Sequence, residues 1–273
     1  MMSTSLKIYT NDAVPEAAKL LIGDDTITFS VLVNILHGVC TKTVTDLESF
    51  ILCYSTSPYP VWVWCKNEKN TETVKNIAAA LRTHFPAEKG FRWNMTHTLF
   101  EALKSYDPYF EPLSTAMGLL SYRIDELLPV THSADGKCDH PTQEEVSLLC
   151  KLWHDACLEM EGFDHNEDFC RARVKAYMEQ NNLFIWRTAE GEIAAITSRR
   201  DTAPFSKVAT VYTVPKHRRH GYAMNLVHAV SKGMLKDGLT PILYTDANYA
   251  ASNACYKKIG YREVAALCCV GKK

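Results

Sequence analysis

The stretch Val214-Pro215-Lys216-His217-Arg218-Arg219-His220-Gly221-Tyr222-Ala223 lies where a predicted strand gives way to a predicted helix. Pro215 ends the strand Val208 to Val214, because proline cannot donate a ladder hydrogen bond. The helix after Gly221 has apolar residues along one face, at Ala223, Leu226, Val227, Val230 and Met234. Unpaired backbone N–H groups and the helix dipole make such a junction a natural anion site.

The chain around this turn is strongly cationic. No Asp or Glu occurs between Thr202 and Lys236, whereas the same window contains Lys207, Lys216, Arg218, Arg219, Lys232 and Lys236. A run of Lys and Arg is more often a solvated surface patch. Here the strand, the proline, the long helix and Gly221, which allows a backbone to approach a ligand closely, all agree. Their agreement favours a phosphate-binding turn over a solvated patch.

The second half of the chain is predicted to be mixed α and β around this turn. Helices come first, then antiparallel strands, the turn with its helix, a strand, a helix and a final strand or pair of strands. The expected elements besides the turn are Gln143 to Met160, Asn166 to Gln180, Leu183 to Trp186, Ile193 to Ile196, Pro241 to Thr245, Ser252 to Ile259 and Tyr261 to Val270.

The first half also reads as mixed α and β. The expected elements are a helix-like segment at Phe29 to Val39, a hairpin of Phe50 to Tyr54 with Val61 to Cys65, and helices at Thr71 to His84 and Met95 to Leu103. A polar stretch between Pro129 and Pro141 is the best place to divide the chain. The predicted domains are therefore residues 1–132 and 133–273.

The composition excludes several classes of function. The 273 residues carry a formal net charge of -1, with a pI of about 6.8, so no global field draws the protein to nucleic acid or an anionic membrane. No apolar run resembles a signal peptide or reaches the roughly 18 residues of a membrane helix, which predicts a soluble, cytoplasmic protein. The ten cysteines are scattered without CxxC pairs, which indicates reduced thiols and no metal site.

Two motifs carry a resemblance to a known family. Residues 214–223 resemble motif A of the GNAT N-acyltransferase superfamily, an Arg/Gln-x-x-Gly-x-Gly/Ala turn whose backbone amides grip the coenzyme A pyrophosphate. Asn253, with Tyr256 three residues later and then Gly260-Tyr261, resembles the second signature of that superfamily. Both motifs stand in the family's order, which makes the match more specific than either motif alone. One departure is Arg219, where many members have Gly; its guanidinium can bind a phosphate in bidentate fashion.

The resemblance implies a GNAT-like α/β fold with a central mixed, mostly antiparallel sheet flanked by helices. In layout the chain is similar to the FR47-like and glycine N-acyltransferase-like tandem proteins. The first half lacks an Arg-x-x-Gly-x-Gly/Ala turn before its Thr71 to His84 helix. We therefore expect a smaller α/β domain there, a degenerate GNAT-like repeat that shapes the acceptor pocket or the inter-domain contact.

The resemblance also implies the site residues, with acetyl-CoA or another acyl-CoA as co-substrate and no metal. The implied cofactor-binding residues are Tyr212, Val214, Lys216, Arg218, Arg219, His220, Gly221, Tyr222, Ala223 and Asn253. Backbone groups around Val214 would hold the pantetheine arm and polarise the thioester carbonyl. Tyr256 would be the general acid, because a phenol with a pKa near about 10 stays protonated at neutral pH. The alternative is that Tyr256 is a core tyrosine and Asn253 a helix cap.

The general base stays open. Its candidates each have an ordinary explanation as helix-end acids, loop acids or surface histidines: Asp246, Glu159, Glu161, Asp164, His154, His217 and His220. The implied function is an acetyl-CoA-dependent N-acetyltransferase acting on a primary amine of a small molecule or amino acid. The alternatives are a non-catalytic acyl-CoA-binding protein of the same fold and a protein N-acetyltransferase. Nucleic acid and membranes are not expected as partners, and the oligomeric state is open.

Overall fold

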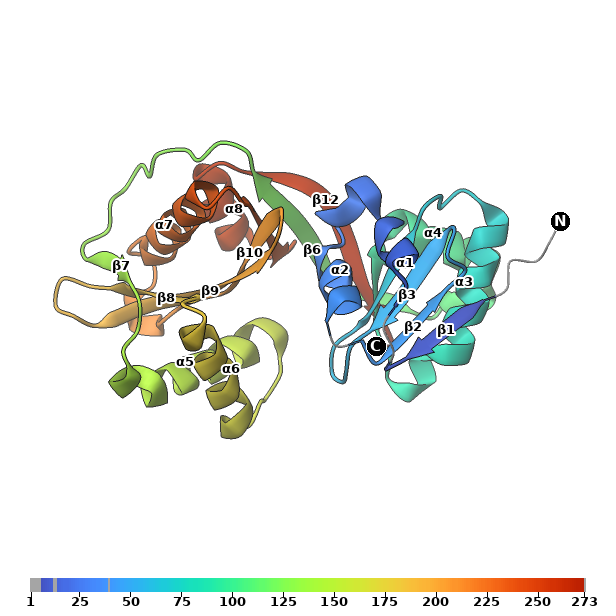
Figure 1. The fold of residues 1–273 in the computed structure, drawn as a ribbon, viewed down its shortest axis with the longest axis horizontal. Helices are drawn as coiled ribbons and strands as arrows, with labels where there is room; N and C mark the ends of the chain where they lie inside the picture. Colours follow the sequence, from blue (N-terminus) through green and yellow to red (C-terminus); the bar gives the residue numbers. More distant parts are fainter. Residues whose placement is uncertain (1–5, 12–13, 39, 273) are drawn as a thin grey trace. The chain divides into compact units, whose positions relative to one another are not determined.

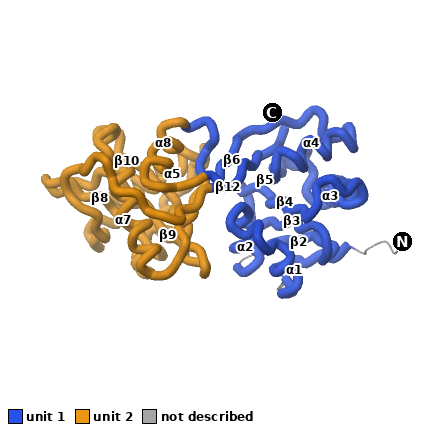
Figure 2. The backbone as a smooth tube through the Cα atoms, turned by 90° about the horizontal axis from the view of Figure 1, so that it is seen from above, with its two compact units in different colours: residues 1–121, 245–249, 263–273 blue, residues 122–244, 250–262 orange. Residues whose placement is uncertain are grey.

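The computed structural model describes residues 6–11, 14–38 and 40–272, apart from the side chain of Glu161 (Figure 1). The chain forms two compact units (Figure 2). Unit 1 contains residues 1–121, 245–249 and 263–273, and unit 2 contains residues 122–244 and 250–262. The division at residue 132 stays a prediction about domains that fold on their own, which compactness does not test.

The sheet of unit 1 has the strand order β1-β2-β3-β4-β5-β12. These strands are β1 (Lys7–Thr10), β2 (Lys42–Thr45), β3 (Phe50–Tyr54), β4 (Val61–Cys65), β5 (Trp93–Thr96) and β12 (Tyr261–Gly271), of which Tyr261 and Arg262 belong to unit 2. The pairs are antiparallel except for β4 with β5, which is parallel. The predicted hairpin is confirmed, because Phe50 pairs with Cys65 and Cys53 with Trp62.

Helices cover both faces of this sheet. They are α1 (Glu16–Leu20), α2 (Ser30–His37), α3 (Thr71–His84), α4 (His97–Tyr106) and the short 3-10 turns Gly23–Thr26, Ala87–Lys89 and Pro108–Phe110. On one face, Val63 and Trp93 pack in a common core with Ile77 of α3 and Leu103 of α4. On the other face, the Trp62 ring meets Phe29 edge-on, with 6.4 Å between the ring centroids. The strand β6 (Ser114–Ile124) follows α4 and the last 3-10 turn.

Unit 2 has the strand order β11-β10-β9-β8-β7. The strands are β7 (Lys137–Asp139), β8 (Leu183–Arg187), β9 (Ile193–Thr202), β10 (Phe205–Thr213) and β11 (Thr240–Asp246), of which Thr245 and Asp246 belong to unit 1. The helices are α5 (Val146–Glu161), α6 (Glu167–Glu179), α7 (Tyr222–Lys236) and α8 (Ala250–Lys258), with 3-10 turns at Gln143–Glu145 and Pro215–His217. Figure 1 shows α7 on one side of this sheet and α5 with α6 on the other.

The mixed fold with a mostly antiparallel sheet flanked by helices confirms the predicted fold class. In unit 2 only β10 with β11 is a parallel pair among the strand pairs that the described residues form between β7 and β11. Several predicted elements are longer than expected. The strand expected at Ile193 to Ile196 continues to Thr202, and the last segment forms one strand, Tyr261–Gly271. No helix within the described ranges has both the length and the apolar character to cross a membrane.

The two units repeat one layout. Unit 1 runs α1, α2, β2, β3, β4, α3, β5, α4, and unit 2 runs α5, α6, β8, β9, β10, α7, β11, α8. In both, the strand before the third helix is parallel to the strand after it, which is the geometry of a crossover connection. The first half therefore repeats the element order of the second half, and its interpretation as a degenerate GNAT-like repeat stays a prediction.

We predict that Gly260→Ala is far more destabilising than Gly238→Ala. Both glycines follow helices of unit 2 with positive φ, +104° and +77°. A β-carbon on Gly260 would lie 2.3 Å from the carbonyl oxygen of Glu126, whereas one on Gly238 meets nothing within 4 Å. Gly238→Ala should cost about 1 kcal/mol from backbone strain alone and Gly260→Ala several times more. Urea unfolding measures both; equal losses would contradict the steric argument.

Candidate functional site

The connection between β10 and α7 is an irregular turn in which two residues adopt the left-handed backbone conformation. They are Arg219, with φ +68°, and Gly221, with φ +83°. Glycine adopts this conformation freely, whereas for an arginine it costs about 1 kcal/mol or more. A non-glycine residue held with positive φ is a feature that clusters at binding and active sites. The left-handed conformation of Arg219 thus makes the backbone of this turn locally unfavourable.

The amino terminus of α7 differs from the matching helix end in unit 1. In α3 the Asn70 side chain accepts hydrogen bonds from the backbone N–H groups of Glu72 at 3.0 Å and Thr73 at 3.2 Å. In α7 the N-cap residue is Gly221, and within the described residues no side chain caps this end and no acidic residue stands in its first turn. The α7 terminus therefore keeps donors and a positive dipole end for an external anion.

The strand that leads into the turn separates from its parallel neighbour. The pairing of β10 with β11 covers Phe205 to Lys207 among the described residues. Farther along, the pairing of β10 with β9 shifts register between Ala209 and Tyr212, and Thr210 there has φ +52°. This is a β-bulge, which bends a strand and often lies next to an active site. The sequence does not predict the bulge, because threonine normally avoids positive φ.

The end of β10 presents backbone groups on the side away from β9. The Val214 N–H donates to the Ala194 carbonyl at 2.9 Å, and the Val214 carbonyl accepts from the His217 N–H at 2.8 Å. Successive strand residues direct their polar groups to opposite sides, so those of Thr213 point toward the side of β11. There the Thr213 carbonyl accepts from Arg218 Nε at 3.2 Å. The Thr213 N–H therefore points away from β9, toward the side where β10, in the residues that the structure describes, no longer pairs with β11.

Two of the predicted cationic residues are already paired with carboxylates. Arg218 Nη2 donates to Glu159 Oε2 at 2.6 Å, and its guanidinium lies 5.7 Å from the Tyr212 ring centre. Lys216 Nζ lies 2.7 Å from Glu192 Oε2, and His217 Nε2 lies 2.9 Å from the same oxygen. These side chains join the turn to α5 and to the β8–β9 hairpin. Arg219 and His220 are exposed at the turn.

Tyr222 ties the first turn of α7 to the segment before β7. Its hydroxyl donates to Asp135 Oδ1 at 2.6 Å, and this hydrogen bond raises the pKa of Tyr222 to about 12. The same bond is the main reason that the pKa of Asp135 is lowered. The His220 ring stacks on Tyr222, with 5.8 Å between centroids. The next residue, Ala223, lies inside the helix.

Asn253 and Tyr256 lie on α8, one helical turn apart, and both are buried. The Tyr256 ring meets Tyr261 edge-on at 6.0 Å between centroids. The Tyr261 hydroxyl lies 2.7 Å from Ser231 Oγ of α7, and burial raises the pKa of Tyr261. This aromatic pair thus connects α8, β12 and α7 inside unit 2. The general-acid role of Tyr256 stays a prediction.

An acidic group lies near the end of β10, on α5. Burial raises the pKa of Tyr212, and the negative charges of Asp155 and Glu159 raise it further.

His154 Nε2 lies 2.9 Å from Asp164 Oδ1, and this contact is the main cause of the raised pKa of His154. A histidine with a raised pKa is more often protonated, which weakens it as a general base.

The structure gives no support for Asp246 or Glu161 as the general base. Asp246 belongs to unit 1, where its Oδ1 accepts from the Asn248 N–H at 2.8 Å in a local turn. The Glu161 side chain lies outside the described part of the chain. Among the described residues, no three His, Cys, Asp or Glu side chains gather as a metal site would require.

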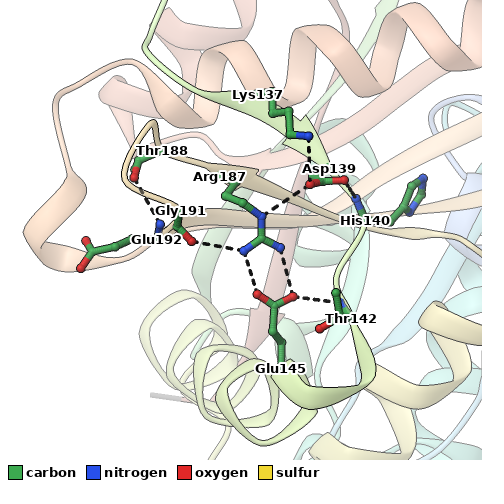
Figure 3. A network of polar contacts seen from close by, with 9 residues as sticks. All are labelled: Lys137, Asp139, His140, Thr142, Glu145, Arg187, Thr188, Gly191 and Glu192. Atoms are coloured by element: carbon green, nitrogen blue, oxygen red, sulfur yellow. Dashed lines mark hydrogen bonds and ion pairs between the residues drawn. The ribbon is translucent and has the colours of Figure 1, made fainter.

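A network of polar contacts surrounds Arg187 (Figure 3). The guanidinium donates to both carboxylate oxygens of Glu145, at 2.8 and 3.1 Å, and to the Gly191 carbonyl at 3.2 Å. Its Nε lies 3.5 Å from Asp139 Oδ2. The Glu145 carboxylate also accepts from the Thr142 N–H at 2.8 Å, which completes a capping box. The network therefore holds β7, the β8–β9 hairpin and the start of α5 together.

A hollow of about 270 Å³ opens between these elements. Glu145 and Glu192 contribute polar side chains to its lining, and Leu152 and Val214 contribute apolar ones. It lies against the end of β10, on the α5 side of the sheet. A volume of this size lies just below the range of about 300–1,000 Å³ that is typical of small-molecule sites.

Comparison with known proteins agrees with this architecture. Residues 184–270 match the family model of the FR47-like protein. The chain is similar to an acetyltransferase of the GNAT family from Colwellia psychrerythraea, with a TM-score of 0.64 and 13% identity over 98% of this chain and 100% of that one. It is also similar to a GCN5-related N-acetyltransferase from Sphaerobacter thermophilus, with a TM-score of 0.71 and 12% identity over 97% and 94%.

A Drosophila protein has a TM-score of 0.68 and 12% identity, with 98% of both chains covered. The search of curated proteins found no match. Because the identities are low, the solved structures show a shared fold, and they share it over nearly the whole chain. The resemblance to the GNAT superfamily is thereby confirmed. The match to the FR47-like model runs from within β8 to within β12, the part of the chain that contains the turn, α7 and α8.

We predict that Glu145→Gln destabilises the protein in a pH-dependent way. The hydrogen bonds from Arg187 are the main reason that the pKa of Glu145 is lowered, and both side chains are 20% exposed. A lowered pKa stabilises the fold above the ordinary value of 4.5, and this stabilisation is lost as the pH falls through the lowered pKa. The variant should lose about 2 kcal/mol at neutral pH and progressively less in acid.

Urea unfolding at several pH values measures this difference. The exposed hairpin residue Glu190 provides the matched control, since Glu190→Gln should change stability by less than about 0.5 kcal/mol at any pH. A loss for Glu145→Gln that is the same at neutral and acid pH would mean that the carboxylate charge contributes nothing.

Proposed function

We propose that this protein is an acetyl-CoA-dependent N-acetyltransferase that acylates a primary amine of a small molecule or amino acid. The observation that carries the proposal is the amino terminus of α7. It begins at Gly221 with φ +83° and lacks a side-chain cap among the described residues. It follows a strand whose parallel pairing, in the part of the chain that the structure describes, ends at Lys207. Such an end favours a bound anion, and the pyrophosphate of coenzyme A is the anion that the GNAT resemblance implies.

The turn fits this group chemically. Backbone N–H groups of Gly221, Tyr222 and Ala223 stand at the start of α7, where helix donors have no intrahelical acceptor. Arg219 and His220 are exposed beside them and can approach phosphate oxygens. Lys216 and Arg218, which are paired with Glu192 and Glu159, would act more through the positive potential of the turn.

The catalytic roles follow from the same arrangement. Coenzyme A supplies the activated acyl group as a thioester. The Thr213 N–H faces the gap beside β10 and would donate to the thioester carbonyl, where negative charge develops during attack. Tyr256 would donate its phenolic proton to the departing sulfur. Asn253 lies one helical turn earlier, where it would orient that phenol or bind the pantetheine arm.

The acidic group on α5 supports an amine acceptor. A primary amine is mostly a cation at neutral pH, with a pKa of about 10. Asp155 places negative charge near Tyr212 at the end of β10, and Glu159 adds to it although its ion pair with Arg218 balances part of its charge. This negative potential would attract such a cation and favour it over an anionic acceptor. The identity of the base that removes the amine's proton stays open.

We predict that wild-type protein binds acetyl-CoA saturably and that Gly221→Asp weakens binding at least about 100-fold. The variant places a carboxylate where the phosphates would lie, and like charges in contact cost several kcal/mol. Calorimetric titration measures the affinity, with adenosine 3′,5′-bisphosphate as competitor. Asn70→Asp at the matching helix of unit 1 is the control and should leave the affinity unchanged, since an aspartate also caps a helix.

Absence of saturable binding by the wild type would remove the main support for the transferase. Thermal melting of each variant shows whether a loss of affinity reflects unfolding instead. Binding that survives Gly221→Asp would move the cofactor site away from this turn.

We predict that Tyr256→Phe lowers kcat about 100-fold or more while acetyl-CoA affinity is retained, because general acid catalysis contributes factors of this size. Tyr261→Phe is the matched control. It removes the contact with Ser231 and should cost about 1 kcal/mol of stability without a comparable loss of kcat. Release of coenzyme A, separated by chromatography, measures turnover over a panel of amines, amino acids and peptides.

The outcomes separate the alternatives. Turnover on peptides alone would identify a protein N-acetyltransferase. Tight acetyl-CoA binding without turnover on any acceptor would identify a non-catalytic binding protein. Unchanged turnover in Tyr256→Phe would assign the proton to another group.

A further inference from the structure

Two cysteines of unit 1 approach each other where β2 begins. Cys40 precedes β2 and Cys53 lies on β3, and their sulfur atoms are 3.6 Å apart as free thiols. The β2–β3 register places Thr43 directly opposite Cys53. Thr43 Oγ1 lies 2.9 Å from Cys40 Sγ and 3.7 Å from Cys53 Sγ. The two thiols and one hydroxyl therefore share a hydrogen-bonded cluster inside the protein.

The backbone around the pair is held in place. The Thr41 N–H donates to the Tyr54 carbonyl at 2.9 Å, which extends the β2–β3 ladder toward Cys40. A disulfide bond needs a sulfur separation of about 2.05 Å. The remaining approach of the two sulfurs is small enough for side-chain rotation, because Cys53 lies on β3 and Cys40 lies two residues before β2, next to the Thr41–Tyr54 hydrogen bond.

The two thiols are not equivalent. Cys53 is fully buried, and burial raises its pKa well above the ordinary value, so it keeps its proton. Cys40 is 9% exposed, and the hydrogen bond from Cys53 lowers its pKa to about 6 despite the opposing effect of burial. The Tyr54 carbonyl, 3.6 Å from Cys40 Sγ, can accept the proton of the neutral form. The outer sulfur thus has thiolate character and the inner one is its hydrogen-bond donor.

We propose that Cys40 and Cys53 are a redox-active dithiol that a hydroperoxide converts into an intramolecular disulfide. The Cys40 thiolate attacks one peroxide oxygen, the O–O bond breaks, and the departing hydroxide takes up a proton to become water. The Cys53 sulfur then attacks the resulting sulfenic sulfur. The S–S bond forms, the S–O bond breaks, and the hydroxyl leaves as water with the Cys53 proton. Two thiols and one hydrogen peroxide thus give one disulfide and two waters.

Other cysteines lack this combination of features. Cys65 is buried on β4, and burial raises its pKa to about 11. Burial has the same effect on Cys138 and Cys255, whose pKa values are also raised to about 11. Such thiols are almost entirely protonated at neutral pH and react slowly. Cys65 is therefore a matched control, a buried cysteine on the strand next to β3.

The test treats the folded full-length protein with dilute hydrogen peroxide at neutral pH, blocks the remaining thiols and maps the peptides by mass spectrometry. Trypsin cleaves after Lys42 and so separates Cys40 from Cys53, which stays with Cys65 until chymotrypsin cleaves after Tyr54. We expect a disulfide-linked pair containing Cys40 and Cys53. Cys53→Ser should abolish the link and leave Cys40 as a sulfenic acid that dimedone traps, and Cys65→Ser should change nothing.

A second measurement does not depend on the oxidant. Iodoacetamide should alkylate Cys40 at least about tenfold faster than Cys65 at neutral pH, and Cys53→Ala should reduce that advantage because it removes the thiol that donates to Cys40. Equal rates for Cys40 and Cys65, or a Cys40 rate unaffected by Cys53→Ala, would overturn the proposal. A link from Cys40 to Cys65, or no link in the folded protein, would do the same. Thermal melting confirms that each variant is folded.

Discussion

The site of unit 2 depends on where one pair of strands stops pairing. β10 and β11 pair in parallel from Phe205 to Lys207, and the bulge at Thr210 then turns the end of β10 away from a regular ladder. Backbone groups beyond this point, including those of Thr213, are left for other partners. The turn and α7 follow at once, so the unpaired strand edge and the uncapped helix end lie next to each other in the chain. The ligand proposed for this site has an amide-containing arm and a phosphate group. The arm would lie along the strand edge, and the phosphate would lie at the helix end.

The repeated layout shows how the two units differ at this helix end. β4 and β5 also pair in parallel over a short stretch, Val61 and Trp62 with Trp93 and Asn94. The helix that follows β4, however, is capped by Asn70 and has Glu72 in its first turn. Internal hydrogen bonds and a negative charge thus occupy the position that would receive an anion. The helix end proposed to hold an anion in α7 is thus occupied by the chain's own groups in α3.

Local patterns in the sequence predict the helices and the turn well. The bounds predicted for Thr71 to His84 agree with α3, because the apolar spacing and the Asn70 cap are both local. The length of β9 is underestimated, since Arg199 and Arg200 resemble a loop. In the structure Arg199 is bound by Asp237 at 2.8 Å, a partner that no local pattern reveals.

The candidate site is predicted only in part for the same reason. Glycine marks the turn at Gly221, but Thr210 and Arg219 adopt positive φ against their own preferences, which only the surrounding structure can impose. The Arg-x-x-Gly-x-Ala motif predicts that Arg218 is a phosphate ligand. Its bond to Glu159 crosses 59 positions of sequence and gives it a second partner that the motif does not indicate.

The segment before β7 has a consequence for how unit 2 responds to a ligand. Asp135 is tied to Tyr222 across 87 positions, and the His132 carbonyl accepts from Asn225 across 93. The start of α7 is therefore hydrogen-bonded to residues 132–135 at two positions. A ligand that binds the start of α7 also restrains residues 132–135. Ligand binding and the ordering of this segment are thus thermodynamically linked, and weakening either one weakens the other.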